Sequence, residues 1–206
     1  MERIHTYSQL NVAYPEKEVF FRLGGNVCRT CMNAEQKLHF DTHAAKAFSL
    51  CRPQGRWMIK KVLACKDGEI TLSGNNVIRS RNFSDLVCGA GYIWISAATV
   101  GREVVACRDG FEDISVAAIY DAVAGEVADS TMDMLQKMAF SELARCGLGL
   151  GARRYSPGYG DMSLEHQRII FELLNMSEMG LSLTENCFMI PEKSVTSLAA
   201  VMAQNN

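Results

Sequence analysis

The sequence lacks the features of secreted, membrane-spanning and nucleic-acid-binding chains. Its N-terminus has no basic stretch leading into an apolar one, and no later uncharged run is long enough to cross a bilayer. The formal net charge is only −2, so the chain has no general attraction for phosphate backbones or anionic lipid. We therefore expect a cytoplasmic protein whose main partner is neither nucleic acid nor a membrane.

Internal repeats and low-complexity tracts are also absent, and 48% of the residues are hydrophobic against 21% charged. A chain of 206 residues with this balance can bury a sizeable core without disulfides or metals. We expect one domain over 1–206, with a helical part at about 1–55 and a sheet with further helices at about 56–206. Eight cysteines without a secretion signal are expected to be reduced thiols.

The spacing of apolar residues predicts an α+β fold. Helices are predicted over 14–23, 33–50, 116–145 and 163–174, with a short helix or turn at 84–87. Strands are predicted at 77–78, 92–98 and 185–189, together with a hairpin over 57–72 that turns at Asp67-Gly68. A short helix is predicted to begin near Ser194. With the apolar run 92–98 as its central strand, the sheet should be mostly antiparallel, with helices packed around it.

The loop 147–161 contains glycines, adjacent arginines and a Ser-Pro-Gly turn that a core does not need. Pro157 and Gly158 suit the second and third positions of a type II turn. Arg154 can clamp a carboxylate, and Tyr159 offers a flat face and a hydroxyl. A small zwitterionic or aromatic ligand would fit such a loop, although a plain surface connection would explain the glycines equally well. The glycines follow a long helix, which argues against a dinucleotide fingerprint.

The cysteines and histidines are candidates for a metal site or for catalysis. Cys28 and Cys31 have the spacing of half a zinc site, which His39 and His43 could complete from one face of a helix. The simpler reading, that these are surface and small core residues, is preferred, and no metal site is assigned. His166 is expected to cap a helix start. No Ser/His/Asp constellation can be assembled, so no catalytic residue is assigned either.

Three motifs occur in order near the C-terminus: Arg154 to Asp161 (RYSPGYGD), Leu183 to Asn186 (LTEN) and Met189 to Val195 (MIPEKSV). They resemble the series RxSPGYGD, LTES and MxPxxSVSG of the activation domain family of cobalamin-dependent methionine synthases. The segment 97–104 is similar to the strand and turn that precede the long helix in short, free-standing members. The resemblance covers most of the chain, and its distinctive part is the C-terminal third.

The resemblance implies an S-adenosylmethionine site. Arg154 would hold the ligand carboxylate, the backbone of Ser156, Pro157 and Gly158 would face the adenine or ribose, and Tyr159 would form part of the pocket wall. Tyr155 lies within the same binding segment. Asp129, in the long helix, falls roughly where short members often carry a glutamate, so it joins the implied site.

The resemblance also implies partners. Domains of this family dock onto a cobalamin-carrying protein, so the chain should act in trans on a corrinoid-binding protein or on a methionine synthase lacking its own activation domain. A reductant protein would supply the electron. Such a chain is a component of a methyltransferase system rather than a stand-alone enzyme. The alternative is a corrinoid-protein docking or scaffold module that no longer binds S-adenosylmethionine, because an acidic residue and a later tyrosine of the large enzymes have no counterpart here.

Overall fold

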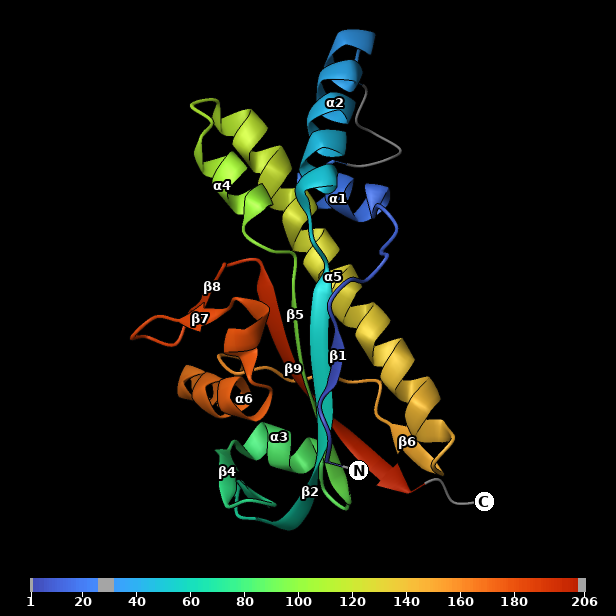
Figure 1. Cartoon of the computed structure of the whole chain (residues 1–206), viewed down its shortest axis with the longest axis vertical. Coiled ribbons are helices and arrows are strands. Elements are labelled where there is room, and N and C mark those ends of the chain that lie inside the picture. Colours follow the sequence, from blue (N-terminus) through green and yellow to red (C-terminus); the bar gives the residue numbers. More distant parts are fainter. Residues whose placement is uncertain (1, 26–31, 204–206) are drawn as a thin grey trace.

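The computed structural model describes residues 2–25 and 32–203, and Figure 1 shows them as a twisted sheet with helices on both faces. The strands of the main sheet are β1 (His5–Tyr7), β2 (Gln54–Lys66), β3 (Glu69–Leu72), β4 (Asn76–Arg79), β5 (Tyr92–Thr99), β6 (Leu148–Leu150) and β9 (Ser194–Ala203). Their order is β4-β3-β2-β5-β9-β6, with β1 paired to β2. Every pairing between them is antiparallel, so the predicted α+β fold is confirmed.

The helices divide between the two faces of the sheet and one end of the molecule (Figure 1). They are α1 (Glu16–Arg22), α2 (Ala34–Leu50), α3 (Arg81–Leu86), α4 (Glu103–Asp109), α5 (Ile114–Ala144) and α6 (Gln167–Leu173), with 3₁₀ turns η1 (Leu164–His166) and η2 (Met176–Met179). A small hairpin of β7 (Ser182–Leu183) and β8 (Met189–Ile190) completes the fold. No helix of the described residues has the length and apolarity to cross a membrane.

Strand β5 is buried on both faces, which explains why its sequence is apolar throughout. Ile93 and Ile95 point into a core shared with α3 and α6, while Trp94 points into a second core beneath the C-terminal half of α5. This alternation follows from the two-residue period of a strand. The prediction that 92–98 forms a central strand is confirmed, because β5 lies between β2 and β9.

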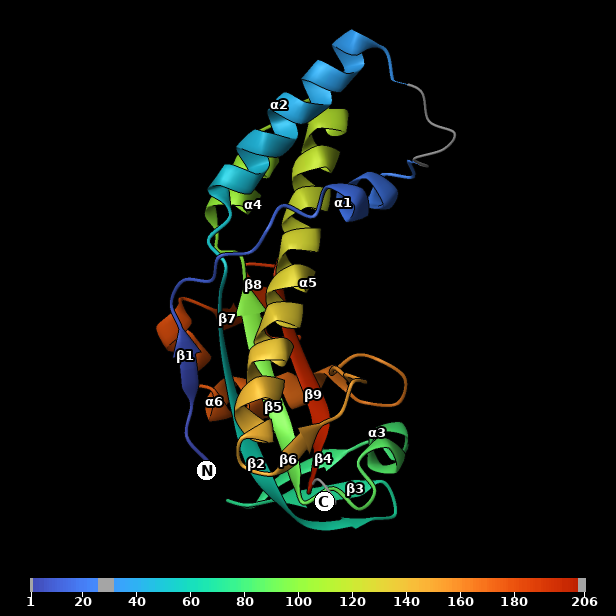
Figure 2. The same ribbon diagram turned by 90° about the vertical axis from the view of Figure 1, so that its right-hand side faces the viewer.

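Helix α5 is longer than the central strand that it covers. Its 31 residues span about 46 Å, whereas the eight residues of β5 span about 27 Å. The N-terminal half of α5 therefore projects beyond the sheet, where α1, α2 and α4 pack around it and bury a third core (Figure 2). Asp113 caps the start of α5 by accepting a hydrogen bond from the Ser115 backbone.

Several local predictions are confirmed, and each of these elements has a local cap or turn that stabilises it. The helix predicted at 33–50 is α2, which begins with a capping box between Asn33 and Gln36. The predicted hairpin turn has Asp67 at φ 54° and Gly68 at φ 81°, between β2 and β3. The helix predicted at 163–174 is split into η1 and α6 and capped by Ser163.

The predicted short helix near Ser194 is wrong, because Ser194 begins β9. This strand pairs with β5 over eight residues, from Thr99↔Ser194 to Tyr92↔Val201. Its alanines, leucine and methionine are helix formers by intrinsic propensity, but pairing and burial on both faces decide the outcome.

Three further segments differ from the sequence expectation. Of the strand predicted at 185–189, only Met189 lies in a strand, β8, and the rest forms the turn between β7 and β8. Glu103 and Val104, at the end of the segment 97–104 that resembles a strand and turn, lie in helix α4. The segment 148–150, expected as part of a glycine-rich loop, forms β6 because it pairs with β9. Strand β6 depends on this long-range pairing, which has no signature in the local sequence.

Candidate functional site

The segment Gly151–Asp161, here called the Arg154 loop, follows β6 and runs along the edge of β9. The backbone of Tyr155 donates to and accepts from Leu198, with N–O distances of 2.8 and 2.7 Å. The Ser156 hydroxyl donates to the Thr196 carbonyl over 2.7 Å. The first half of the loop is therefore fixed to the sheet by its own polar groups, and the Ser156 hydroxyl is already used for this.

The middle of the Arg154 loop forms the turn predicted from its Pro-Gly pair. Gly158 has φ 89°, a conformation that favours glycine, and the Tyr159 N–H donates to the Ser156 carbonyl over 3.2 Å. Pro157 is buried, whereas the Tyr159 side chain is 69% exposed. The turn thus leaves one aromatic ring free on the surface of the loop.

The far end of the loop is fixed to helix α3 by Asp161. Its carboxylate accepts from the Ser80 hydroxyl at 2.5 Å and from the backbone N–H of Arg81 at 2.6 Å. The hydrogen bond from Ser80, followed by those from the backbone, holds the pKa of Asp161 below its usual value of 3.8. Beneath the loop, the Tyr155 ring stacks on Phe83 with a centroid separation of 5.6 Å, so Tyr155 serves as support.

An acidic row, formed by Glu126, Asp129 and Asp133, lies along α5 at helical spacing. At its C-terminal end, Nη1 of Arg154 lies 2.7 Å from Oδ1 of Asp133. This nitrogen is buried, yet its N–H bonds have no aligned hydrogen-bond acceptor among the described residues. The guanidinium group of Arg154 therefore forms an ion pair with the row and still has N–H bonds that can donate to another acceptor.

Arg22 of α1 meets the other end of the acidic row. Its guanidinium hydrogen-bonds to Glu126 and reaches Oδ2 of Asp129 at 3.0 Å. Gly125 makes room for this contact, because a Cβ atom there would come within 3.3 Å of the guanidinium. Figure 2 shows that α1 and the Arg154 loop lie on the same side of α5.

The electrostatics of the row are those of a partly compensated acidic site. Three carboxylates and two guanidinium groups leave one negative charge uncompensated. Burial raises the pKa of Asp129, and the charges of Glu126 and Asp133 raise it further, against the opposing effect of the two arginines. A cationic group of a ligand would therefore be attracted here, while the free N–H bonds of Arg154 suit an anionic group.

A groove opens beside this cluster. It has a volume of about 400 Å³ and lies between the C-terminal half of α5 and the first residues of the Arg154 loop. Asp133, Phe140 and Leu150 are among its lining residues. Gln136 holds its rim by donating to the carbonyls of Gly151 and Ala152 at 2.9 and 3.2 Å.

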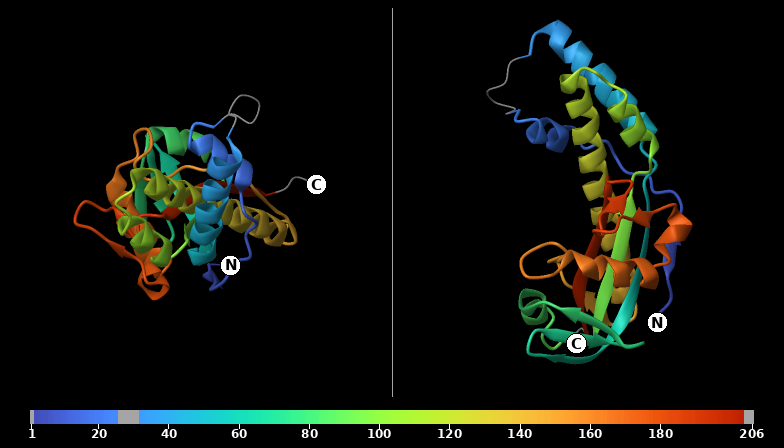
Figure 3. Two further views of the ribbon diagram at one scale, coloured as in Figure 1. Left: turned by 90° about the horizontal axis from the view of Figure 1, so that it is seen from above. Right: turned by 90° about the vertical axis from the view of Figure 1, so that its left-hand side faces the viewer.

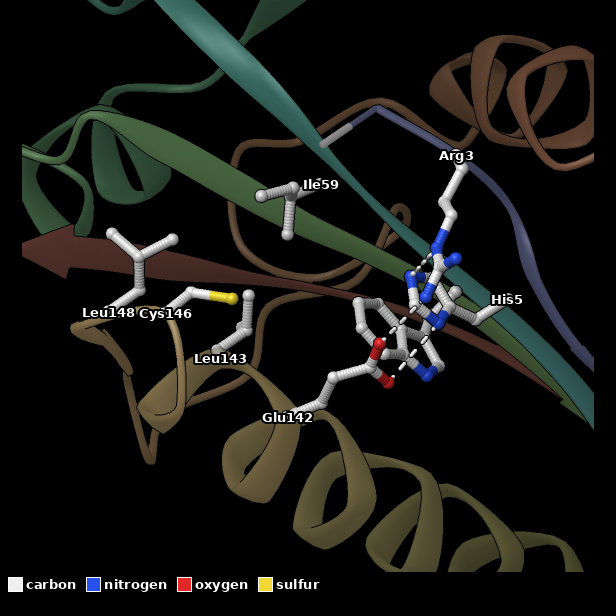
Figure 4. A pocket seen from close by; sticks show the side chains of 8 residues that line it. Arg3, His5, Ile59, Glu142, Leu143, Cys146 and Leu148 are labelled. Carbon is white, nitrogen blue, oxygen red and sulfur yellow. Dashed lines mark hydrogen bonds and ion pairs between the residues drawn. The ribbon is translucent and has the colours of Figure 1, made fainter.

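A second cavity, of about 310 Å³, lies at the C-terminal end of α5 and is shown in Figure 4. Glu142 bridges Arg3 and His5 on one side of it, at 3.1 and 3.2 Å. Apolar side chains, including Ile59 and Leu143, line the other side. It shares no lining residue with the Arg154 loop or the acidic row, so it is separate from the candidate site.

The structure brings some of the predicted site residues close together and separates others. Arg154 and Asp129 do lie on the same side of α5, but Arg154 contacts Asp133, and Asp129 pairs with Arg22. Glu126 and Asp133 were missed, although their spacing from Asp129 in a predicted helix could have indicated one acidic face. Arg22 could not have been found, because only tertiary packing brings α1 to α5.

The histidine and cysteine predictions have different outcomes. Cys28 and Cys31 lie outside the described residues, so the zinc hypothesis stays untested, although the His39 and His43 rings are adjacent, with centroids 4.6 Å apart. Among the residues described, no three His, Cys, Asp or Glu side chains are grouped to hold a metal ion. The prediction that His166 caps a helix start is wrong, because its side chain makes no capping hydrogen bond and Ser163 caps η1. Instead, one ring nitrogen accepts from the Arg79 N–H, and the other lies 3.0 Å from the Ser163 carbonyl.

Comparison with known proteins identifies the family. Residues 80–205 match the family model described as the activation domain of vitamin B12-dependent methionine synthase, and this range is more than half of the chain. The chain belongs to this family. The range includes the Arg154 loop and the acidic row, while α1 and its Arg22 lie outside it.

The fold of this activation-domain member also matches solved structures. One is the crystal structure of the MetH reactivation domain bound to AdoHcy, with a TM-score of 0.69 and 17% sequence identity. The match covers 100% of this chain and 80% of the MetH domain, so it establishes a shared fold. No curated protein sequence matches the chain significantly.

Proposed function

We propose that this activation-domain member binds S-adenosylmethionine at the Arg154 loop and presents its methyl group to a corrinoid held by another protein. The observation that carries the proposal is the buried Nη1 of Arg154, which has no aligned acceptor among the described residues and lies beside an acidic row. S-adenosylmethionine carries a carboxylate, an ammonium and a sulfonium group. The carboxylate suits Arg154, and the two cations suit the uncompensated negative charge of the row.

The other residues of the loop would supply shape rather than acid–base chemistry. The exposed Tyr159 ring offers a face for the adenine, and the backbone of Ser156, Pro157 and Gly158 offers polar groups for the nucleoside. When bound, S-adenosylmethionine supplies an electrophilic methyl group, which the partner's corrinoid accepts after one-electron reduction, leaving S-adenosylhomocysteine. The chain contributes placement: its loop is anchored at β9 and at α3, so the donor is held in a fixed position.

We further propose that the corrinoid lies on a separate protein and that the chain works with it in the cytoplasm. The described residues fold into the main sheet, the β7–β8 hairpin and the helices around them, and the match to the fold of the MetH reactivation domain covers the whole of this chain. The partner would be a corrinoid-binding protein, or a methionine synthase lacking its own activation domain, together with a reductant protein. Membership in the activation domain family supports this choice of partner.

Calorimetric titration tests ligand binding directly. We expect saturable heat with S-adenosylmethionine and with S-adenosylhomocysteine, and we expect Arg154→Ala to weaken both about 10- to 100-fold. A charge-assisted hydrogen bond contributes about 1.5–3 kcal/mol, which gives this range. Arg153→Ala is the matched control, because it removes the same charge from the adjacent, exposed position. Absence of binding at millimolar ligand, or equal weakening by both variants, would exclude the assigned site.

A second candidate function is a docking or scaffold module that no longer binds S-adenosylmethionine. The pairing of Arg154 with Asp133, and of Arg22 with Glu126 and Asp129, favours it, because the charges already have partners within the chain. This candidate predicts association with a corrinoid protein in the absence of any heat from the small ligand.

A further inference from the structure

The carboxylate-binding position of Arg154 is already in contact with a carboxylate. Oδ1 of Asp133 lies 2.7 Å from Nη1 of Arg154, the same nitrogen that is buried and lacks an aligned acceptor among the described residues. A ligand carboxylate is the same chemical group as the Asp133 side chain. A second carboxylate at this nitrogen would lie close to that of Asp133, and the repulsion between the two negative charges makes them compete for Arg154, to the disadvantage of the contact that is less well aligned.

The contact between Asp133 and Arg154 is one that a ligand carboxylate can replace. The Asp133 side chain is 56% exposed and the Arg154 side chain 27%, so water can solvate Asp133 when it leaves. The Nη1–H bonds do not point at Oδ1, so an ion pair is present without an aligned hydrogen bond. Partly exposed pairs of this kind stabilise a fold only weakly, so a better-aligned ligand carboxylate binds Arg154 more strongly than Asp133 does.

The position of the Arg154 loop does not depend on Asp133. The backbone of Tyr155 pairs with Leu198, Gln136 holds the carbonyls of Gly151 and Ala152, and Asp161 ties the far end to α3. Removing the Asp133 charge should therefore leave the loop in place and free the guanidinium group. The ion pair occupies the site without forming part of its scaffold.

We propose that Asp133 is an internal competitor, whose side chain occupies the carboxylate-binding position of Arg154 until a ligand carboxylate displaces it. This inference rests on the proposed function, because it takes Arg154 as the residue that receives the ligand carboxylate. The competition makes Asp133 a specificity-determining residue. A ligand that brings a carboxylate recovers the lost ion pair, whereas an adenosine derivative without one does not open it.

Comparison of two ligands with the Asp133→Asn variant tests this inference. S-adenosylhomocysteine carries the carboxylate, and its decarboxylated analogue keeps the adenosine and the amino group. We expect Asp133→Asn to tighten S-adenosylhomocysteine about two- to fivefold in calorimetry, the range of a partly exposed ion pair, because Glu126 and Asp129 remain to attract the ammonium group of the ligand. The decarboxylated analogue should bind no more tightly to the variant than to the parent chain.

Glu142→Gln is the matched control, because it removes one negative charge from the same helix at the separate cavity of Figure 4. It should leave the affinity for S-adenosylhomocysteine unchanged. Weaker or equal binding of S-adenosylhomocysteine to Asp133→Asn would overturn the inference, since it would make Asp133 a residue that positions Arg154 or a bystander. Tightening of both ligands alike would also overturn it. Failure of the parent chain and the variant to bind either ligand would remove the proposed function itself.

Discussion

Single side chains of the Arg154 loop divide between those that build it and those left free for a ligand. The side chains of Tyr155, Ser156 and Asp161 are engaged by the rest of the fold, whereas Tyr159 is exposed and Arg154 retains hydrogen-bonding capacity. The sequence motif does not distinguish these roles, because the partners come from β9, α3 and α5. Rigid support beneath a few free groups is what an accurately placed donor requires.

Asp161→Ala tests this support at the residue scale. We expect the variant to be less stable than the parent at neutral pH and to bind S-adenosylhomocysteine more weakly, because the loop loses its attachment to α3. The pKa of Asp161 is lowered by folding, so its contribution is fully present above the ordinary value of 3.8 and is lost as the pH falls through the folded value. Urea unfolding at pH 7 and near pH 3 should show a stability difference that shrinks in acid. A difference independent of pH would contradict this role of the carboxylate.

Helices and strands of this chain were predictable where the signal is local. The cap at Asn33, the Asp67-Gly68 turn and the apolar run of β5 each specify their own structure. Strand β9 was mistaken for a helix start because its residue types favour helix, and only its pairing with β5 makes it a strand. Likewise, the Arg154 loop was recognisable from its turn residues, but Arg22 is 107 residues from its partner Asp129 and has no local signal.

Close packing of α5 on β2 gives a prediction at the scale of elements. A Cβ atom at Gly55 of β2 would lie 2.9 Å from the Ala97 carbonyl oxygen and closer still to the Leu135 side chain of α5. We expect Gly55→Ala to destabilise the fold by about 1–3 kcal/mol through overpacking, as measured by urea unfolding. Gly91→Ala is the control, because nothing lies within 4 Å of its added Cβ. Equal stabilities of the two variants would refute this packing.

Across the whole molecule, the groups proposed to hold the donor lie on one side. Figure 3 shows α1 and the Arg154 loop on the same side of α5, as does Figure 2. Long helix α5 connects the helical end of the molecule with the sheet, and its acidic row lies along the same side. A corrinoid-carrying partner that receives the methyl group would have to approach this side of α5. We therefore expect this side to be accessible when the two proteins are in complex.

The most direct test of the central claim is the visible spectrum of a Co(II) corrinoid protein, taken from a cobalamin-dependent methionine synthase without its activation domain. When this chain, S-adenosylmethionine and a one-electron reductant are added, we expect the Co(II) spectrum to change to that of the methylated corrinoid. With the Arg154→Ala variant, the conversion at subsaturating S-adenosylmethionine should be at least about tenfold slower. If calorimetry shows that the donor is bound but the conversion is no faster than without the chain, the proposed presentation of the methyl group to the corrinoid is wrong.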